Sequence, residues 1–345
     1  MVRHVPSSTL FWPLIDRFFR PERGDVMSSR TKKNRIRAGN LFVPQIFSFG
    51  AALEEMSIEE FLDDPTKISN TLRMIQNFFQ VDGVFCYADS TVLAEALGCN
   101  ISKHSYPPTV RPLSDDVENL NAKMGGLTQG GRIATVLEVT KRLNILLPEC
   151  VIVGLVTGPL TLAGQLSGRK GSAVFEYSDL LGSASKASLI FSKALGETGI
   201  DVLMMYEKSF PLLDDNSAKA IAKLYAPIWN TAKFYDIKSL LMVEEFLPEN
   251  MPLLRRVTEG LVFPLELTSD SWQKVRKPSL SLPFSLLEKE PNEIESFLKN
   301  FRVLNESESS NFFMLTTDSE VPASINKEFM IRGIQTIRDL LKRDA

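Results

Sequence analysis

Eight short apolar runs recur along the 345-residue chain, and most of them end at a polar or acidic residue. They cover residues 41–48, 83–89, 151–157, 201–207, 239–245, 260–266, 279–284 and 311–316. Continuous apolar runs of this length are typical of strands buried on both faces, and segments with helical periodicity lie between most of them. Eight βα units close most simply into a (β/α)8 TIM barrel, so the pattern predicts an α/β fold with a single barrel domain.

Acidic side chains stand at the ends of several predicted strands, namely Asp89, Glu207, Glu244, Glu245 and Glu266. Reactive groups in a (β/α)8 barrel lie at the C-terminal ends of the strands, which makes these carboxylates candidate functional residues. Glu244 and Glu245 are adjacent, so only one of them can point inward on an extended strand. The structural alternatives are a helix cap or a rim ion pair for Asp89, and an ion pair with the next residue for Glu207.

The composition excludes several classes of protein. A net charge of −3 gives no reason to expect nucleic acid as a partner. No apolar stretch approaches the roughly 20 residues that a membrane-spanning helix needs. The three cysteines, Cys86, Cys99 and Cys150, show no CxxC or CxH spacing, which argues against a disulfide framework and a cysteine-rich zinc site. We therefore expect a cytoplasmic protein without a membrane span.

Residues 1–37 differ from the rest and are expected to form an N-terminal helical extension, with the barrel over residues 38–345. Apolar residues between positions 14 and 19 share one helical face, and a basic run follows over residues 30–37. A helix that covers the bottom of the barrel, an extension ahead of a start at Met27, and a targeting arm all agree with this pattern.

The connection between the second and third predicted strands, residues 90–150, is longer than a plain βα loop and is expected to cover part of the barrel mouth. His104 lies in this connection, close to Pro107, and is a candidate substrate-binding residue, although a solvated loop histidine is the more common case. Further along, the pattern predicts a helix over residues 172–195 that breaks at Gly182.

The most specific stretch is residues 153–164, with the sequence VGLVTGPLTLAG. A buried strand ends at Thr157, Gly158 permits tight backbone geometry, and Pro159 pre-sets the backbone for a first helical turn. Free amides at such a turn would suit an anionic ligand. The string resembles the strand-Gly-Pro-x-Thr-Leu motif of the uroporphyrinogen decarboxylase superfamily. That superfamily contains the porphyrinogen decarboxylases and the methylcobalamin:coenzyme M type methyltransferases, all on (β/α)8 barrels.

Further segments resemble the same superfamily in the same order. They are a strand ending in aspartate and a following Ala-Leu-Gly at 81–98, the helix at 132–141, and the final strand and loop at 312–322. The opening region, residues 42–65, is closer to the methyltransferase branch than to the decarboxylases. The resemblance covers about residues 38–340.

The chain departs from the decarboxylase pattern. Decarboxylases carry an Arg-Gln-Ala-Gly-Arg-Tyr motif whose arginines neutralise substrate carboxylates, and residues 35–40, RIRAGN, only superficially echo it. Gln165 stands where the family has a tyrosine, and of the catalytic set only the aspartate carries over, as Asp89. Without the arginines the carboxylates of a porphyrinogen would be desolvated with poor compensation, which disfavours uroporphyrinogen decarboxylation.

The chain also departs from the methyltransferase pattern, in which a His-x-Cys pair and a late cysteine hold zinc. Glu244 and Phe246 stand in place of the pair, and Asp318 or Ser319 in place of the late cysteine. A zinc-thiolate site is therefore not supported, which leaves a carboxylate-rich site for a harder metal or no metal. Because Glu244 occupies the family's ligand position, we favour it over Glu245.

The resemblance implies corrinoid-linked methyl transfer, in which a small methylated substrate at the barrel mouth exchanges its methyl group with a separate corrinoid protein. Asp89, Glu207 and Glu244 are expected to position or protonate the substrate. The expected substrate-binding residues are Gly158, Pro159, Gln165, Glu266, Asp318 and His104. Converging acids could give acid/base chemistry, a divalent-ion site or a site for a quaternary amine. The alternatives are decarboxylation of a porphyrinogen or related tetrapyrrole acid, and a catalytically silent barrel that binds a tetrapyrrole or a corrinoid protein.

Overall fold

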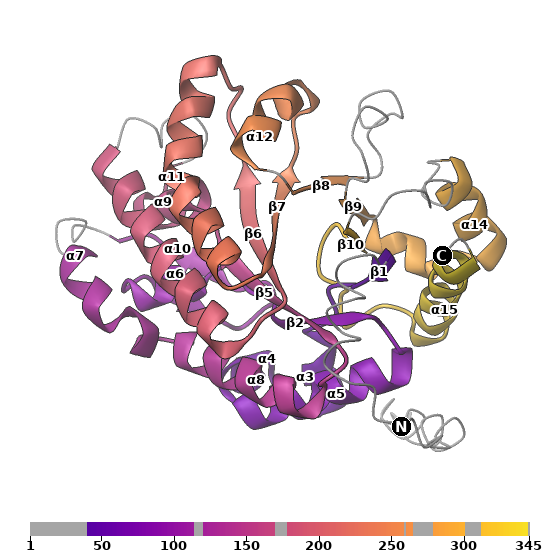
Figure 1. Cartoon of the computed structure of the whole chain (residues 1–345). Helices are drawn as coiled ribbons and strands as arrows, with labels where there is room; N and C mark the ends of the chain where they lie inside the picture. The colour runs from indigo at the N-terminus through magenta and orange to yellow at the C-terminus, as the bar shows by residue number, and fades with distance from the viewer. Residues whose placement is uncertain are drawn as a thin grey trace, which may run out of the picture.

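Eight parallel strands form one sheet that curls into a nearly closed barrel, with helices around the outside (Figure 1). The computed structural model describes residues 40–113, 120–169, 178–258, 260–264, 279–300 and 312–343. The strand order is β1-β10-β9-β8-β7-β6-β5-β2. The strands are β1 (Asn40–Phe42), β2 (Gly83–Tyr87), β5 (Val151–Thr157), β6 (Val202–Ser209), β7 (Lys238–Glu245), β8 (Leu261–Pro264), β9 (Ser279–Leu282) and β10 (Phe313–Thr317). Each lies at one of the eight predicted runs, which confirms the (β/α)8 prediction.

The first and second strands meet at the seam of the barrel. The Asp82 amide donates to the Phe42 carbonyl over 3.1 Å, and the Phe42 amide donates to the Asp82 carboxylate over 2.9 Å. These two bonds take the place of a regular ladder between β1 and β2, and they bring the loops after both strands to the same end of the barrel.

Helices lie between most of the strands and cover the outer face of the sheet (Figure 1). They are α3 (Phe49–Leu53), α4 (Ile58–Asp63), α5 (Pro65–Phe79), α6 (Val92–Ala96), α7 (Leu120–Lys123), α8 (Ile133–Leu146), α9 (Pro159–Ser167), α10 (Ser178–Thr198), α11 (Asp215–Phe234), α12 (Met251–Val257), α14 (Pro291–Asn300) and α15 (Lys327–Arg343), with 3-10 turns η3 (Met124–Gln129), η5 (Pro248–Asn250) and η6 (Phe284–Glu288). The capping box Ser57–Glu60 opens α4 because each side chain bonds the backbone amide of the other residue.

The predicted break at Gly182 is wrong, because α10 continues through it. A glycine inside a helix costs only about 1 kcal/mol relative to alanine. The buried neighbours Leu180, Leu181 and Ala184 pack against the core and outweigh that cost.

Side chains alternate along the strands between two apolar layers. On β5, Val151, Val153 and Leu155 belong to the layer that fills the barrel, whereas Ile152 and Val156 belong to the layer between the sheet and the helices. Successive strand residues point to opposite faces, so the same alternation decides which strand-end residues reach the barrel mouth.

An antiparallel hairpin, β3 (Asn100–Ser102) and β4 (Thr109–Arg111), interrupts the connection between β2 and β5. The turn between its strands carries His104 and Tyr106. The predicted extension over residues 1–37 and the acid Glu266 lie outside the described residues. Within the described ranges, no helix combines the length and apolar character that crossing a bilayer requires.

Candidate functional site

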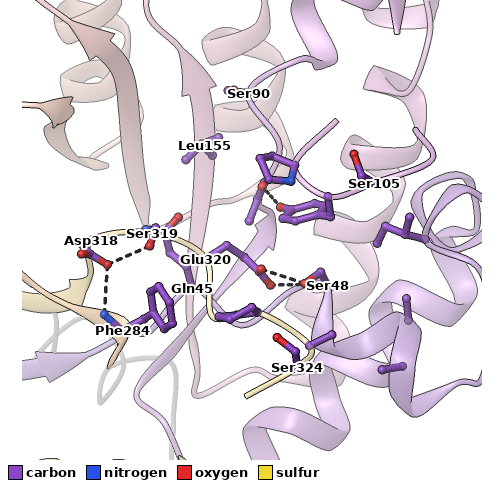
Figure 2. A pocket seen from close by; sticks show the side chains of 18 of the residues that line it. Gln45, Ser48, Ser90, Ser105, Leu155, Phe284, Asp318, Ser319, Glu320 and Ser324 are labelled. Carbon is purple, nitrogen blue, oxygen red and sulfur yellow. Dashed lines mark hydrogen bonds between the residues drawn. The ribbon is translucent and has the colours of Figure 1, made fainter. Parts of the chain in front are cut away.

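A cavity of about 690 Å³ opens at the C-terminal ends of the strands. Its floor and walls include inner positions of three neighbouring strands: Leu155 on β5, Tyr206 on β6, and Met242 and Glu244 on β7. The loops after β1, β2, β9 and β10, the turn of the hairpin, and residues of α3 and α4 also contribute to the lining. Figure 2 shows Gln45, Ser48, Ser90, Ser105, Phe284 and Ser324 around this space.

Two acids predicted from the sequence, Glu244 and Asp318, line this cavity. The Tyr206 hydroxyl donates a hydrogen bond to Glu244. Burial, together with that bond to the carboxylate, raises the pKa of Tyr206 well above its usual range. Asp318 accepts from the Phe284 amide over 3.1 Å and from the Ser319 hydroxyl over 2.9 Å (Figure 2). Protein donors therefore hold the orientation of both carboxyl groups at the cavity.

Glu320 is a third cavity acid that the sequence analysis missed. It accepts hydrogen bonds from the Phe47 amide over 3.0 Å, the Ser48 amide over 2.6 Å and the Ser48 hydroxyl over 2.8 Å (Figure 2). Burial raises the pKa of Glu320 to about 7, and these hydrogen bonds act against that rise. Its position could have pointed to Glu320, because it follows the C-terminal end of β10 by three residues and functional residues of this fold lie at such ends.

Gln45 ties the loop after β1 to β10. Its backbone amide donates to the Thr317 hydroxyl over 3.0 Å, and its side-chain amide donates to the Thr317 carbonyl over 2.9 Å. Gln45 and Glu320 together join the first and last strand ends, so this wall of the cavity depends on closure of the barrel.

Asp89 is only 4% exposed and lies beside the cavity lining, which includes its neighbours Ala88 and Ser90. It pairs with the guanidinium of Arg132, whose other nitrogens donate to Glu95 over 2.6 Å and to the Thr91 hydroxyl over 2.8 Å. This arrangement is the rim ion pair that the sequence left open as an alternative.

Glu207, on β6, is fully buried, and its carboxyl group lies against the first turn of α9. It accepts from the Leu160 amide over 3.1 Å, the Thr161 amide over 2.7 Å, the Thr161 hydroxyl over 2.6 Å and the Tyr225 hydroxyl. Burial raises the pKa of Glu207 to about 7 against the opposing effect of these bonds. The backbone amides after Gly158, which the sequence analysis expected to suit an anionic ligand, therefore donate to the carboxyl group of Glu207 instead.

The remaining predicted residues divide between the cavity and its support. His104 lines the cavity, is 84% exposed, and has its Nδ1 3.4 Å from a Glu59 carboxylate oxygen. Gln165 donates to the Ser90 carbonyl over 3.2 Å and is not among the lining residues. Gly158 and Pro159 are buried at the start of α9 and do not line the cavity either. The structure thus brings Glu244, Asp318 and His104 together, with the other described candidates around them.

The donors around this cavity do not fit a zinc-thiolate centre. Cys86, Cys99 and Cys150 are buried and none of them lines the cavity. Burial raises the pKa of the Cys86 and Cys99 thiols to about 11, which disfavours the thiolate that zinc requires. Across the described ranges, no three His, Cys, Asp or Glu side chains are grouped so that they could hold a metal ion.

The fold is that of a (β/α)8 barrel protein with a cavity at the mouth of the barrel. The chain belongs to the uroporphyrinogen decarboxylase (URO-D) family, whose model matches residues 46–225, just over half of its length. This confirms the resemblance inferred from residues 153–164.

Solved structures with the same architecture include a methyltransferase and a methionine synthase. A methyltransferase from Methanosarcina mazei is 19% identical, with a TM-score of 0.70 over 92% of this chain and 99% of that chain. A B12-independent methionine synthase from Shewanella sp. W3-18-1 is 11% identical, with a TM-score of 0.53 over 83% of this chain and 90% of that one. At these identities the likeness is one of fold. No curated protein matches the chain.

Proposed function

We propose that the chain is a corrinoid-linked methyltransferase that takes the methyl group from a small substrate bound in the barrel mouth. The observation that carries this proposal is the cavity of about 690 Å³ at the barrel mouth, which Glu244 lines. The sequence resemblance places Glu244 where the methyltransferase branch has a zinc ligand. Family membership and the similarity of residues 42–65 to that branch support it.

In this reaction the bond between the methyl carbon and its donor atom breaks, the electron pair stays on the donor atom, and the methyl group passes to the corrinoid. A reduced corrinoid on a partner protein would supply the nucleophile. This chain would bind and orient the methylated substrate. Tyr206 retains its proton and donates it in a hydrogen bond to Glu244, which orients the Glu244 carboxyl group at the cavity for contact with the substrate.

Porphyrinogen decarboxylation agrees less well with the cavity. Among the described residues, no lysine or arginine lines the cavity. The buried guanidinium of Arg132 forms salt bridges with Asp89 and Glu95. The many carboxylates of a porphyrinogen would be desolvated next to Glu244, Asp318 and Glu320 without cationic partners.

The test is a direct assay of methyl transfer with the full chain. The protein is mixed with cob(I)alamin and, in separate reactions, methanol, dimethyl sulfide or choline, and methylcobalamin is followed by its absorbance. We expect at least one donor to react about 100-fold faster than without protein, as positioning of reactants allows. Conversion of uroporphyrinogen to coproporphyrinogen by the same preparation, with no methyl transfer, would overturn the proposal in favour of decarboxylation.

A further inference from the structure

We propose that the cavity binds a methylated ammonium cation of the trimethylammonium class and that this cation is the methyl donor. This inference deepens the proposed function, because it names the class of substrate for the same site. It follows from the charge of the lining, from the way its carboxylates are already hydrogen-bonded, and from its aromatic and thioether walls.

The lining is rich in acidic side chains and poor in basic ones. Glu244, Asp318 and Glu320 all contribute carboxyl groups, and within the described chain the one basic side chain in the lining is His104. His104 is largely exposed and lies next to another acid, Glu59. Carboxylates that share a partly enclosed space repel one another and favour a cationic ligand over a neutral or anionic one.

The hydrogen-bonding state of these carboxylates favours a cation without N–H donors. Glu244 already accepts from Tyr206, Asp318 from Phe284 and Ser319, and Glu320 from Phe47 and Ser48. Glu320 accepts three such bonds, Asp318 two and Glu244 one, so protein donors already fill part of the acceptor capacity of these carboxyl groups. A trimethylammonium group needs charge and contact but donates no hydrogen bond, so it matches this lining better than a primary ammonium group does.

The remaining walls suit a cation whose charge is spread over methyl groups. Tyr106, Tyr206 and Phe284 contribute aromatic rings to the lining, and Met56 and Met242 contribute thioethers. Aromatic faces attract quaternary ammonium ions through the ring quadrupole and exclude water around them. The cavity therefore combines negative charge with apolar contact.

Choline and 3,3-dimethylbutan-1-ol provide matched probes, because they have the same shape and hydroxyl and differ only in the charged nitrogen. Calorimetric titration of the full chain should give at least about tenfold tighter binding of choline, in line with a cation beside aromatic rings and carboxylates. Glu244→Gln should weaken choline about fivefold or more and leave the neutral alcohol unchanged. The matched control, Glu245→Gln, changes the neighbouring acid outside the lining and should alter choline affinity less than twofold.

Equal affinity for the two probes, absence of choline binding, or equal effects of the two substitutions would overturn this inference. The titration needs no corrinoid, so its outcome separates the inference from the proposed function. Choline binding without methyl transfer would keep the ligand class and reject methyl transfer. Methyl transfer from methanol or dimethyl sulfide without choline binding would keep methyl transfer and reject the trimethylammonium class of ligand.

Discussion

Glu207 and Glu244 stand at the ends of paired strands, yet only Glu244 reaches the cavity. Side-chain alternation explains the difference: Tyr206 takes the inward position on β6, which turns Glu207 outward to α9, whereas Met242 and Glu244 both point inward on β7. Alternation of side chains along a strand distinguishes Glu244 from Glu245, and it distinguishes Tyr206 from Glu207 in the same way. The inward position of Tyr206 could therefore have been predicted from the sequence.

Removal of the Glu244 carboxylate should affect turnover and leave folding intact. Glu244 is exposed at the end of β7, and its partner is the Tyr206 hydroxyl at the cavity. We expect Glu244→Ala to lower the methyl-transfer rate by about 100-fold or more, and to change the free energy of unfolding by less than about 1 kcal/mol. Rates and urea denaturation curves measured on one preparation check both parts. Unchanged turnover would remove Glu244 from the site.

Removal of the Glu207 carboxylate should act on stability. Its loss leaves the buried Leu160 amide, the part-buried Thr161 amide and the Tyr225 hydroxyl without this acceptor. We expect Glu207→Ala to lower the free energy of unfolding by about 3 kcal/mol, measured by urea denaturation. Lys208→Ala, on the exposed neighbour, should change it by less than about 0.5 kcal/mol. Equal denaturation midpoints for the two variants would contradict the capping role.

At the scale of elements, the start of α9 depends on the close approach of Gly158 to Glu207. A Cβ atom at Gly158 would lie 2.7 Å from the Glu207 Cγ and closer still to the carboxylate. Gly158→Ala should therefore cost about 2 kcal/mol in the wild-type chain. In a Glu207→Ala background the clash disappears, so the same substitution should cost much less, and a double-mutant cycle measures the coupling.

Gly182 is the control for that experiment, because it lies inside α10 with open space where a Cβ would stand. Gly182→Ala should raise the free energy of unfolding by about 0.5–1 kcal/mol through helix propensity alone. Additive effects of Gly158→Ala and Glu207→Ala would show that the two residues do not act through one another.

The elements themselves were largely predictable, whereas the partners of the buried charges were not. A run of buried strand residues and the capping box at Ser57 are local signals, and both are present in the structure. The partner of Asp89 is Arg132, 43 residues away, and Glu320 meets Ser48 across 272 residues. Such pairings exist only once the barrel has closed, so no local pattern in the chain marks them.

For the whole molecule, two buried acids with raised pKa values link stability to pH. Burial raises the pKa of Glu207 and of Glu320 to about 7, against an ordinary value of 4.5. Between about pH 4.5 and 7 the folded chain therefore binds these protons more tightly than the unfolded chain does. The contribution of these two groups to the free energy of unfolding must fall as pH rises through that window.

Glu320→Gln isolates one of the two groups, because its amide oxygen can still accept from Phe47 and Ser48 while the group no longer titrates. We expect the stability difference, variant minus wild type, to rise by about 1 kcal/mol or more from pH 4.5 to pH 7.5, as a raised carboxyl pKa requires. Urea denaturation at several pH values measures this difference. Parallel stability curves would mean that Glu320 titrates alike in the folded and unfolded chains, and that its burial between the first and last strand ends does not perturb it.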